Sequence, residues 1–337
     1  MPATYKILDL KDINHNEEEQ SFALDILLGL SQNPKKISSR YFYDKEGSEL
    51  FFFFSELPEY YLTKCEFEIM EKYKEQIANL VAGEAFNLIE LGPGDGRKTN
   101  VLLKHFLGAG LNFQYIPIDI SEASMKDLII SMNNKFSDLN THGLVTEYFS
   151  GIKWLNENKK RKNLILFMGS NIGNFNASHA RAFLRSLWNS LNNDDYILIG
   201  FDLKKDIDLM LNAYNDSQGI TSSFNMNLLK RINKELGGNF DIEKFRHFSN
   251  YDVYSGAIES YLISTEKQIV FLKELGQEFS FQAWEPMHTE YSYKYLESDI
   301  ELLAKETGFT IEKQFYDSKN YFVDSIWKVN KISRKST

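Results

Sequence analysis

The run FNLIELGPGDG at residues 86–96 decides the fold. Its first half is mostly apolar, as expected of a strand that is buried on both faces of a sheet. Its second half places glycines at Gly92, Gly94 and Gly96, just before a helical segment that starts near Lys98. A buried strand, a glycine-rich turn and a helix in this order are typical of an open α/β sheet that binds a ligand at its strand ends.

The spacing of these glycines bears on the ligand. A dinucleotide fold prefers G-x-G-x-x-G, which seats a pyrophosphate on the helix N-terminus. Here the pattern is G-x-G-x-G, and the acidic Glu90 lies two residues before Gly92. This pattern suits a ligand that carries an ammonium group and no phosphate, and it disfavours an NAD-dependent oxidoreductase. Taken alone, the motif is weak evidence for such a ligand, because an ordinary strand-to-helix turn also explains it.

The α/β alternation continues beyond this motif. Strands are predicted at residues 113–120, 144–149, 164–169 and 196–203, with helices at 98–106, from 121 and at 178–191. A further helix at 298–308 precedes two strands, 309–316 and 321–329, which a short polar link joins as a hairpin. Such alternation predicts a mostly parallel sheet with helices on both faces. A terminal helix and hairpin are typical of the Rossmann-like class I sheet of SAM-dependent methyltransferases.

A second lobe is predicted from the change of pattern after residue 203. Residues 204–285 are helical and polar with a few strand-like runs, and therefore read as an insertion. We expect 1–66 plus 204–285 to form a substrate-binding lobe over the strand ends. The remaining 67–203 plus 286–333 form the predicted SAM-binding methyltransferase domain.

Two further features point to a nucleoside site. Asp119 ends the second predicted strand, 27 residues after Gly92, where a carboxylate can accept both ribose hydroxyls. NAD sites use the same device, so Asp119 alone does not select the cofactor. The run FMGSNIGNF at residues 167–175 leaves the fourth strand as a loop that faces the transferring methyl in this fold, although an ordinary turn is the alternative.

The composition restricts partners and location. A formal net charge of −9 argues against a nucleic-acid backbone or an anionic membrane as the main partner. No apolar run is long enough for a membrane span, and residues 1–10 do not read as a signal peptide. The single cysteine, Cys65, excludes an intrachain disulfide and suggests a cytoplasmic location. The scattered histidines predict no metal site, and we expect a monomer.

Taken together, these residues resemble the histidine-specific methyltransferases of ergothioneine biosynthesis. That family uses S-adenosyl-L-methionine to trimethylate the α-amino group of histidine, giving hercynine. The resemblance runs in order from Arg40 to Trp327. The matching stretches are Tyr43–Asp44, Gly47–Phe51, Leu57–Tyr61 with Thr63 and Glu66, Glu90–Lys98, Pro117–Ser121, Gly169–Ser170, Ile172–Asn174, Gly200–Leu203, Ala213–Asp216, Thr221–Asn227, Ile258–Glu259 and Thr289–Tyr295.

The resemblance implies roles for individual residues. The residues that would hold the cofactor are Gly92, Gly94, Lys98, Asp119 and Gly169, with Glu147 and Tyr148 at the adenine. Those that would hold the carboxylate and amine of the amino acid, and so serve catalysis, are Tyr60, Asn174 and Tyr214. The imidazole would face Glu290 and Ser292, which can exchange hydrogen bonds with its two nitrogens.

One departure from the family leaves the substrate open. After Ile258-Glu259 the family commonly has Met beside the substrate side chain, and this chain has Ser260. The first alternative is therefore a methyltransferase of the same family that acts on another amine or aromatic amino acid, such as a tryptophan derivative. A second alternative is a SAM-binding protein without catalysis. For His247 and His288, structural or surface roles are predicted.

Overall fold

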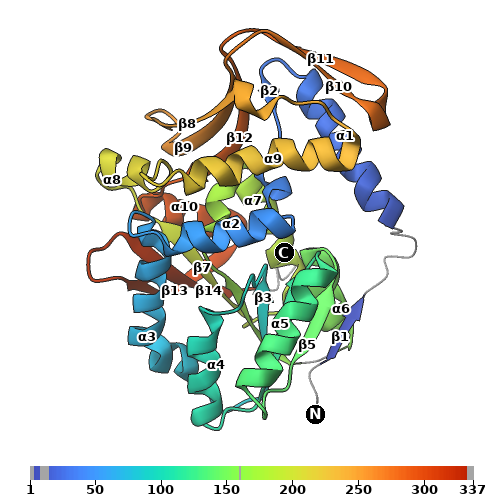
Figure 1. Cartoon of the computed structure of the whole chain (residues 1–337). Coiled ribbons are helices and arrows are strands. Elements are labelled where there is room, and N and C mark those ends of the chain that lie inside the picture. The colour runs from blue at the N-terminus through green and yellow to red at the C-terminus, as the bar shows by residue number, and fades with distance from the viewer. Residues whose placement is uncertain (1–3, 8–14, 159–160, 332–337) are drawn as a thin grey trace, which may run out of the picture. The chain divides into compact units, whose positions relative to one another are not determined.

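The computed structural model describes residues 4–7, 15–158 and 161–331 (Figure 1). The chain divides into two compact units, each assembled from segments that are far apart in the sequence. Unit 1 comprises Met1–Lys11, Lys64–Leu203 and Tyr295–Thr337, and unit 2 comprises Asp12–Thr63 and Lys204–Lys294.

These units differ from the predicted division at the edges. Strand β1 (Thr4–Ile7) pairs in parallel with β5 of unit 1, although residues 1–66 were assigned to the substrate-binding lobe. Strand β12 (Glu285–Tyr293) pairs with β9 of unit 2, although residues from 286 onward were assigned to the methyltransferase domain. Each strand belongs to the unit that contains the strand with which it forms backbone hydrogen bonds. The sequence pattern does not reveal this pairing.

Unit 1 is built on an eight-stranded sheet in the order β1-β5-β4-β3-β6-β7-β14-β13. All pairings are parallel except those of β14, which is antiparallel to both of its neighbours. This mostly parallel sheet with a terminal hairpin confirms the predicted class I fold. Its remaining strands are β3 (Phe86–Leu91), β4 (Phe113–Asp119), β5 (His142–Val145), β6 (Lys162–Phe167), β7 (Tyr196–Asp202), β13 (Phe309–Tyr316) and β14 (Phe322–Val329).

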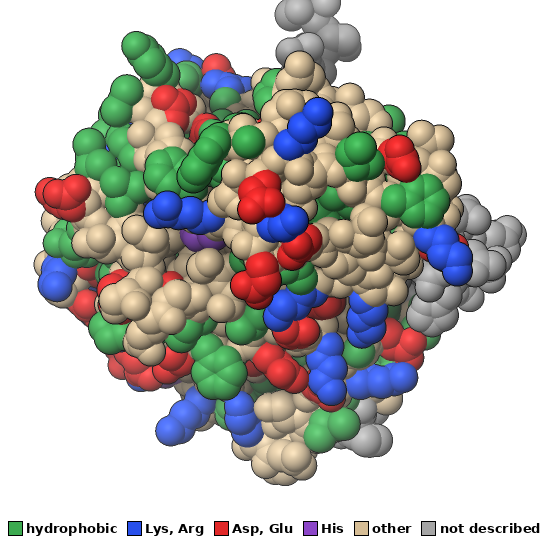
Figure 2. Space-filling model, turned by 45° about the horizontal axis from the view of Figure 1, so that its top comes forward, with side chains coloured by type: hydrophobic (Ala, Val, Ile, Leu, Met, Phe, Trp, Pro, Cys, Tyr) green, Lys and Arg blue, Asp and Glu red, His purple; other side chains and the backbone are tan. Residues whose placement is uncertain are grey.

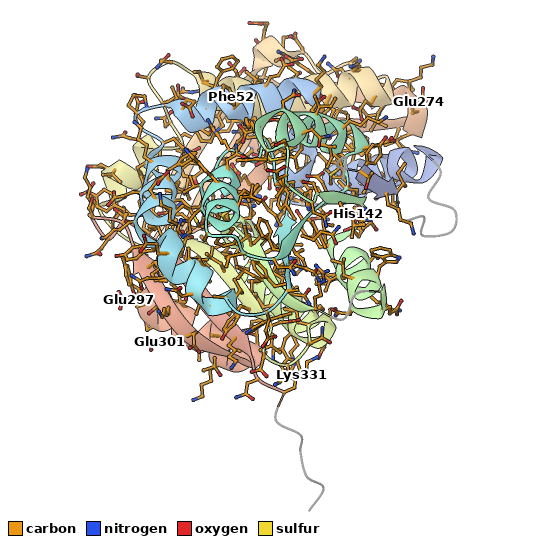
Figure 3. The ribbon with its side chains drawn as sticks, turned by 90° about the horizontal axis from the view of Figure 1, so that it is seen from below. Phe52, His142, Glu274, Glu297, Glu301 and Lys331 are labelled. Carbon is orange, nitrogen blue, oxygen red and sulfur yellow. The ribbon has the colours of Figure 1, made fainter. Side chains whose placement is uncertain are left out.

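Helices cover both faces of this sheet (Figure 1). The α helices of the unit are α3 (Tyr61–Val81, whose first turn belongs to unit 2), α4 (Thr99–Gly108), α5 (Glu122–Lys135), α6 (Tyr148–Asn158), α7 (Ala177–Ser190) and α10 (Glu297–Thr307). Helix α10 buries Ile300 and Leu303, whereas Glu297 and Glu301 point outward one turn apart (Figure 3). This amphipathic division explains why a helix forms there.

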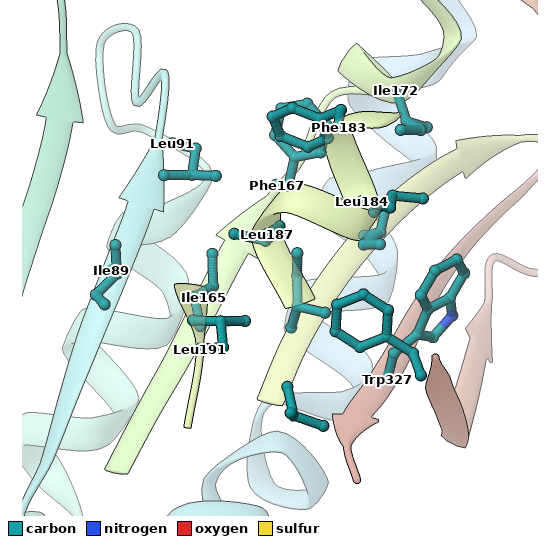
Figure 4. Packing of buried hydrophobic residues seen from close by; sticks show 14 of the residues in the cluster. Ile89, Leu91, Ile165, Phe167, Ile172, Phe183, Leu184, Leu187, Leu191 and Trp327 are labelled. Atoms are coloured by element: carbon teal, nitrogen blue, oxygen red, sulfur yellow. The ribbon is translucent and has the colours of Figure 1, made fainter. Parts of the chain in front are cut away.

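The core of unit 1 lies between the sheet and helices α6, α7 and α10. Ile89, Ile165 and Phe167 of the central strands meet Phe183 and Leu187 of α7 (Figure 4). Every residue of β3 and of β7 is buried, which is the mark of a parallel sheet covered on both faces. The polar side chains that these strands do contain, such as Asn87 and Glu90 of β3, are buried with them.

Unit 2 holds a four-stranded sheet in the order β2-β12-β9-β8 and a two-stranded hairpin, β10-β11. The prediction that 204–285 is mainly helical was incomplete, because most of residues 245–281 form strands. Polar residues at inward-facing positions of these strands weaken the alternation of apolar and polar residues that predicts a strand. The elements are α1 (His15–Ser31), β2 (Lys35–Lys36), α2 (Lys45–Glu56), α8 (Ile207–Asn212), α9 (Ile220–Leu236), β8 (Phe245–Asp252), β9 (Ala257–Ser264), β10 (Gln268–Leu272) and β11 (Gln277–Phe281), with β12 as above.

Short 3-10 turns complete both units. They are Ser39–Phe42, Ile242–Lys244 and Lys273–Leu275 in unit 2 and Asn171–Asn174 in unit 1. In unit 2, α9 packs Phe224 and Leu228 against Leu262 and Met287 of the sheet. Burial alternates along β9, with Ser260 and Leu262 buried and Glu259 and Tyr261 partly exposed, so one face of this sheet faces a packed interior.

Candidate active site

The turn after β3 requires its glycines. Gly92 and Gly94 have φ angles of 66° and 55°, a left-handed conformation that side chains rarely adopt. A Cβ atom at Gly92 would lie 2.8 Å from the hydroxyl oxygen of Tyr148, whereas one at Gly94 would meet nothing within 4 Å. The turn therefore brings bare backbone close to Tyr148 and leaves space above Gly94.

Asp119 and Tyr148 lie beside this turn. Asp119 is the last residue of β4, and its carboxylate accepts the backbone N–H of Ser121 at 2.8 Å. Burial raises the pKa of Asp119, and burial with the charges of Asp119 and Glu147 raises the pKa of Tyr148. The strand predicted over 144–149 ends at Val145, and Tyr148 begins helix α6 instead. The exposed Glu147 precedes that helix.

Glu90 serves the scaffold. Its two carboxylate oxygens accept hydrogen bonds from the hydroxyls of Thr99 and Tyr115. Burial raises the pKa of Glu90 to about 7, against the lowering effect of these hydrogen bonds and of Lys98. The carboxylate that the sequence pattern associated with a ligand ammonium thus joins β3, β4 and the first turn of α4.

Lys98 is held by a glutamate that the sequence analysis left without a role. The fully buried Glu66 of α3 forms an ion pair with the Lys98 ammonium and accepts the backbone N–H of Gly169 at 2.7 Å. A Cβ atom at Gly169 would lie 3.1 Å from the Lys98 nitrogen. Two of the predicted cofactor residues, Lys98 and Gly169, are therefore joined through Glu66.

The loop after β6 holds Asn174 at the end of a 3-10 turn. Gly169 and Ser170 both have positive φ angles, 76° and 57°. The Ser170 hydroxyl accepts the backbone N–H of Asp202, and the Tyr295 hydroxyl donates to the Ile172 carbonyl at 3.3 Å. These contacts fix the loop against β7 and against Tyr295, which lies two residues before α10. The loop is therefore anchored within unit 1.

In unit 2, three of the predicted substrate residues share one network with a lysine. The hydroxyls of Tyr214 and Ser292 lie 2.6 Å apart. The buried Lys294 ammonium donates to Ser292 at 2.7 Å and to Tyr214 at 3.2 Å. The ring of Tyr60 lies 6.1 Å from that of Tyr214 at 75°, an edge-to-face arrangement, and also contacts Phe54. Tyr60, Tyr214 and Ser292 are thus held in one arrangement.

Ser260 and Glu290 are directly paired across β9 and β12. The Ser260 hydroxyl lies 3.1 Å from that of Ser249, which in turn lies 3.1 Å from Nε2 of His247. Burial raises the pKa of Glu290 to about 7, and the nearby Lys294 ammonium opposes this shift. Burial lowers the pKa of His247 to about 4, so this ring is neutral at physiological pH.

Sequence reasoning missed Lys294, Ser249 and Glu66 as contributors. Lys294 and Glu66 lie in stretches that carried the family resemblance, but local patterns gave them no function. Ser249 reaches Ser260 only through strand pairing, for which the sequence offers no signal. His288 is buried against Tyr291, and burial lowers the pKa of His288 to about 3.

We also searched the described residues for metal-binding clusters, for surface patches of one charge and for membrane-spanning helices. Among the described residues, no cluster of three or more His, Cys, Asp or Glu is suited to a metal ion. On the face drawn in Figure 2, acidic and basic side chains are interspersed rather than gathered by sign. In the part of the chain that the structure describes, no helix is long and apolar enough to cross a membrane.

Comparisons with known proteins point to one family. The model of a family described as histidine-specific, SAM-dependent methyltransferase matches residues 22–329. Histidine N-alpha-methyltransferase of Mycolicibacterium smegmatis is 31% identical over 284 residues, 84% of this chain and 87% of that protein. The protein of the same name from Mycobacterium tuberculosis is 32% identical over 271 residues, covering 80% and 83%. The 4-dimethylallyltryptophan N-methyltransferase easF of Claviceps purpurea is 26% identical over 329 residues, covering 91% and 94%.

The sheet order, the glycine-rich turn and these matches define one class of enzyme, and the protein is a SAM-dependent N-methyltransferase. More narrowly, the chain belongs to the histidine-specific, SAM-dependent methyltransferase family.

Proposed function

We propose that this enzyme transfers methyl groups from S-adenosyl-L-methionine to the α-amine of histidine, to the N-alpha-trimethyl stage. The observation that carries the proposal is the gathering of Tyr60, Tyr214, Ser292 and Lys294 in one network, with Glu290 on the same strand as Ser292. Hydroxyl groups suit a carboxylate and an amine, and a carboxylate suits an imidazole N–H.

The cofactor side fits S-adenosyl-L-methionine, which supplies a methyl group activated by its sulfonium sulfur. Gly92 and Gly94 present bare backbone, and the absence of any atom within 4 Å of a Cβ at Gly94 leaves room for a ligand. Asp119 offers a half-buried carboxylate to the ribose hydroxyls. Lys98 and Gly169 are suited to the methionine carboxylate and amine, and Glu147 with Tyr148 to the adenine.

On the substrate side, we assign the amino-acid carboxylate and amine to Tyr60 and Tyr214 of unit 2, and Asn174 of unit 1 stays a prediction from the family resemblance. Lys294 can donate but not accept, so its hydrogen bonds make the Ser292 and Tyr214 oxygens acceptors and orient their hydrogens. Orientation of the amine toward the methyl group is the main task of such residues, because the sulfonium is already a good leaving group.

The side-chain pocket of the proposed substrate includes Ser260, Glu290 and Ser292. Glu290 would accept an imidazole N–H, and Ser292 would contact the second ring nitrogen. The hydrogen-bonded row of His247, Ser249 and Ser260 is polar where the family commonly places Met. This row is the observation that keeps a different polar or aromatic amino acid as the second candidate substrate.

The test is a methyl-transfer assay with S-adenosyl-L-methionine and each common amino acid, read by mass. We expect product from histidine, heavier by about 42 Da for three methyl additions, with little from other amino acids. Samples without an amino acid control for methylation of the enzyme itself. A product from another amino acid but not from histidine would overturn the substrate assignment. Binding of S-adenosyl-L-methionine without transfer to any amino acid would instead favour a non-catalytic binding protein.

A further inference from the structure

Two carboxyl groups are close neighbours beneath the loop that carries Gly169. Glu66 of α3 and Asp324 of β14 are both fully buried in unit 1. Asp324 is paired across the sheet with Gly200 of β7. A Cβ atom at Gly200 would lie 2.7 Å from the Glu66 carboxylate, so the missing side chain of Gly200 makes the space that Glu66 fills.

The hydrogen-bond partners of the two carboxyl groups are unequal. Glu66 accepts from the Lys98 ammonium and from the backbone N–H of Gly169. Within the described residues, no N–H or O–H group donates to either oxygen of Asp324. A buried carboxylate without donors is strongly disfavoured, whereas a buried carboxylic acid can donate its own proton. The neighbouring group that could accept a hydrogen bond from a protonated Asp324 is the Glu66 carboxylate.

We propose that Asp324 is a carboxylic acid that donates its proton to Glu66, and that this acid–carboxylate pair sets the charge and position of Lys98 in the cofactor site. The inference rests on the proposed function, since it assigns Lys98 and Gly169 to S-adenosyl-L-methionine. With Asp324 protonated, Glu66 and Lys98 form a neutral pair. Loss of the Asp324 proton adds a negative charge beside the group that would meet the cofactor carboxylate.

The surrounding charges agree with this assignment. Burial and the Glu66 charge raise the pKa of Asp324 well above its usual range, and Lys98 opposes them. The strand neighbours of Asp324, Gly200 on β7 and Phe315 on β13, carry no charge. Glu90, which interacts electrostatically with both Lys98 and Glu66, is the remaining acidic group of this cluster. Asp324 is thus a positioning residue that acts through Glu66 and Lys98.

The test measures binding of S-adenosylhomocysteine by titration calorimetry between pH 7 and 9.5, with the wild type and Asp324→Asn. Asparagine keeps a donor for Glu66 but cannot ionise. We expect wild-type affinity to fall at least about tenfold more than that of Asp324→Asn once Asp324 loses its proton. The ligand's own amine titrates equally in both experiments and cancels in the ratio. Asp324→Asn should bind as tightly as the wild type at pH 7.

Asp195→Asn is the matched control. Asp195 is a buried carboxylate of the same unit that accepts hydrogen bonds from Asn163 and Asn192. Its replacement should lower the melting temperature without changing the pH dependence of binding. Because the folded-state pKa of Asp324 is raised, wild-type stability should fall relative to Asp324→Asn as the pH rises.

Equal pH profiles for the wild type and Asp324→Asn would overturn the proposal, as would weaker binding by Asp324→Asn at pH 7. A pH-independent wild-type affinity would overturn it without any variant, even if Asp324→Asn did not fold. Binding of S-adenosylhomocysteine does not depend on the amino-acid substrate, so these outcomes are separate from failure of the histidine assignment.

Discussion

The two sheets of this protein place polar groups in different ways. In unit 1, β3 and β7 are buried throughout, and the residue that we assign to the cofactor ribose, Asp119, lies at the end of β4. In unit 2, polar groups lie within the strands and face each other across the ladder, as Ser249, Ser260 and Glu290 do. A parallel sheet covered on both faces has its chemistry at an edge, whereas an alternating antiparallel sheet can line a face with it.

The difference teaches how each set of groups is held. The strand-end groups of unit 1 are fixed by local turns, because the glycine conformations and the Ser121 hydrogen bond lie within a few residues of Gly92 and Asp119. The groups of unit 2 are fixed by each other, because Ser292 touches both Tyr214 and Lys294. We therefore expect a substitution at Asp119 to act singly and substitutions at Tyr214 and Ser292 to be coupled.

The largest expected effect is that of Asp119→Ala. Two charge-assisted hydrogen bonds to the ribose would be lost, each worth about 1.5–3 kcal/mol, partly offset by removal of a half-buried charge. We expect S-adenosylhomocysteine to bind about 100-fold more weakly by calorimetry. Asp138→Ala, at an exposed aspartate of the same unit, is the control. Unchanged binding by Asp119→Ala would remove Asp119 from the cofactor site.

A smaller effect is expected for Tyr214→Phe and Ser292→Ala. Each should raise the histidine KM about tenfold, with cofactor binding unchanged, because each removes one hydroxyl. The double variant should fall short of the product of the single effects, with a coupling of about 1 kcal/mol. Tyr254→Phe, at a tyrosine that is 96% exposed, is the control. Independent effects would contradict the idea that unit 2 holds these groups as one network.

The smallest expected effect is a pH dependence of histidine binding. Burial raises the pKa of Glu290 to about 7, so the carboxylate that would accept the imidazole N–H becomes protonated below that pH. We expect the histidine KM to rise about fivefold more in the wild type than in Glu290→Gln between pH 7 and 6. The titration of histidine itself affects the KM of both proteins equally and therefore cancels in the ratio of the two KM values. A constant ratio would show that Glu290 does not contact the imidazole in its ionised form.

The same contrast explains how much the sequence predicts. In unit 1, the run at residues 86–96 and Asp119 predict both the sheet and its ligand edge, because strand, turn and helix are encoded by neighbouring residues. The role of Glu66 is hidden, because it depends on Gly200 and Asp324, which are more than 100 residues away in the sequence. No local sequence pattern shows that Gly200 of β7 leaves room for the side chain of Glu66 on α3.

Unit 2 is less predictable for the same physical reason. Its inward-facing strand positions include Ser249, Ser260 and Ser292, so the alternation of apolar and polar residues is weak and the strands read as a polar helical insertion. The resemblance to known enzymes supplied Tyr60, Tyr214 and Glu290, whereas Lys294 gained a role only from its contacts. When a sheet has polar residues on its packed face, its strands lack the alternation of apolar and polar residues by which strands are predicted from sequence.

The pairing of β2 with β12 has a consequence for biosynthesis. Lys35 pairs with Met287, so about 250 residues must be synthesised before this strand meets its partner. At roughly 5–20 residues per second, the N-terminal segment waits about 10–50 s on the ribosome with α1 and α2 lacking the partners that cover them. The apolar side chains of Phe22, Ile26 and Phe42, buried in the finished unit, are therefore unprotected during translation.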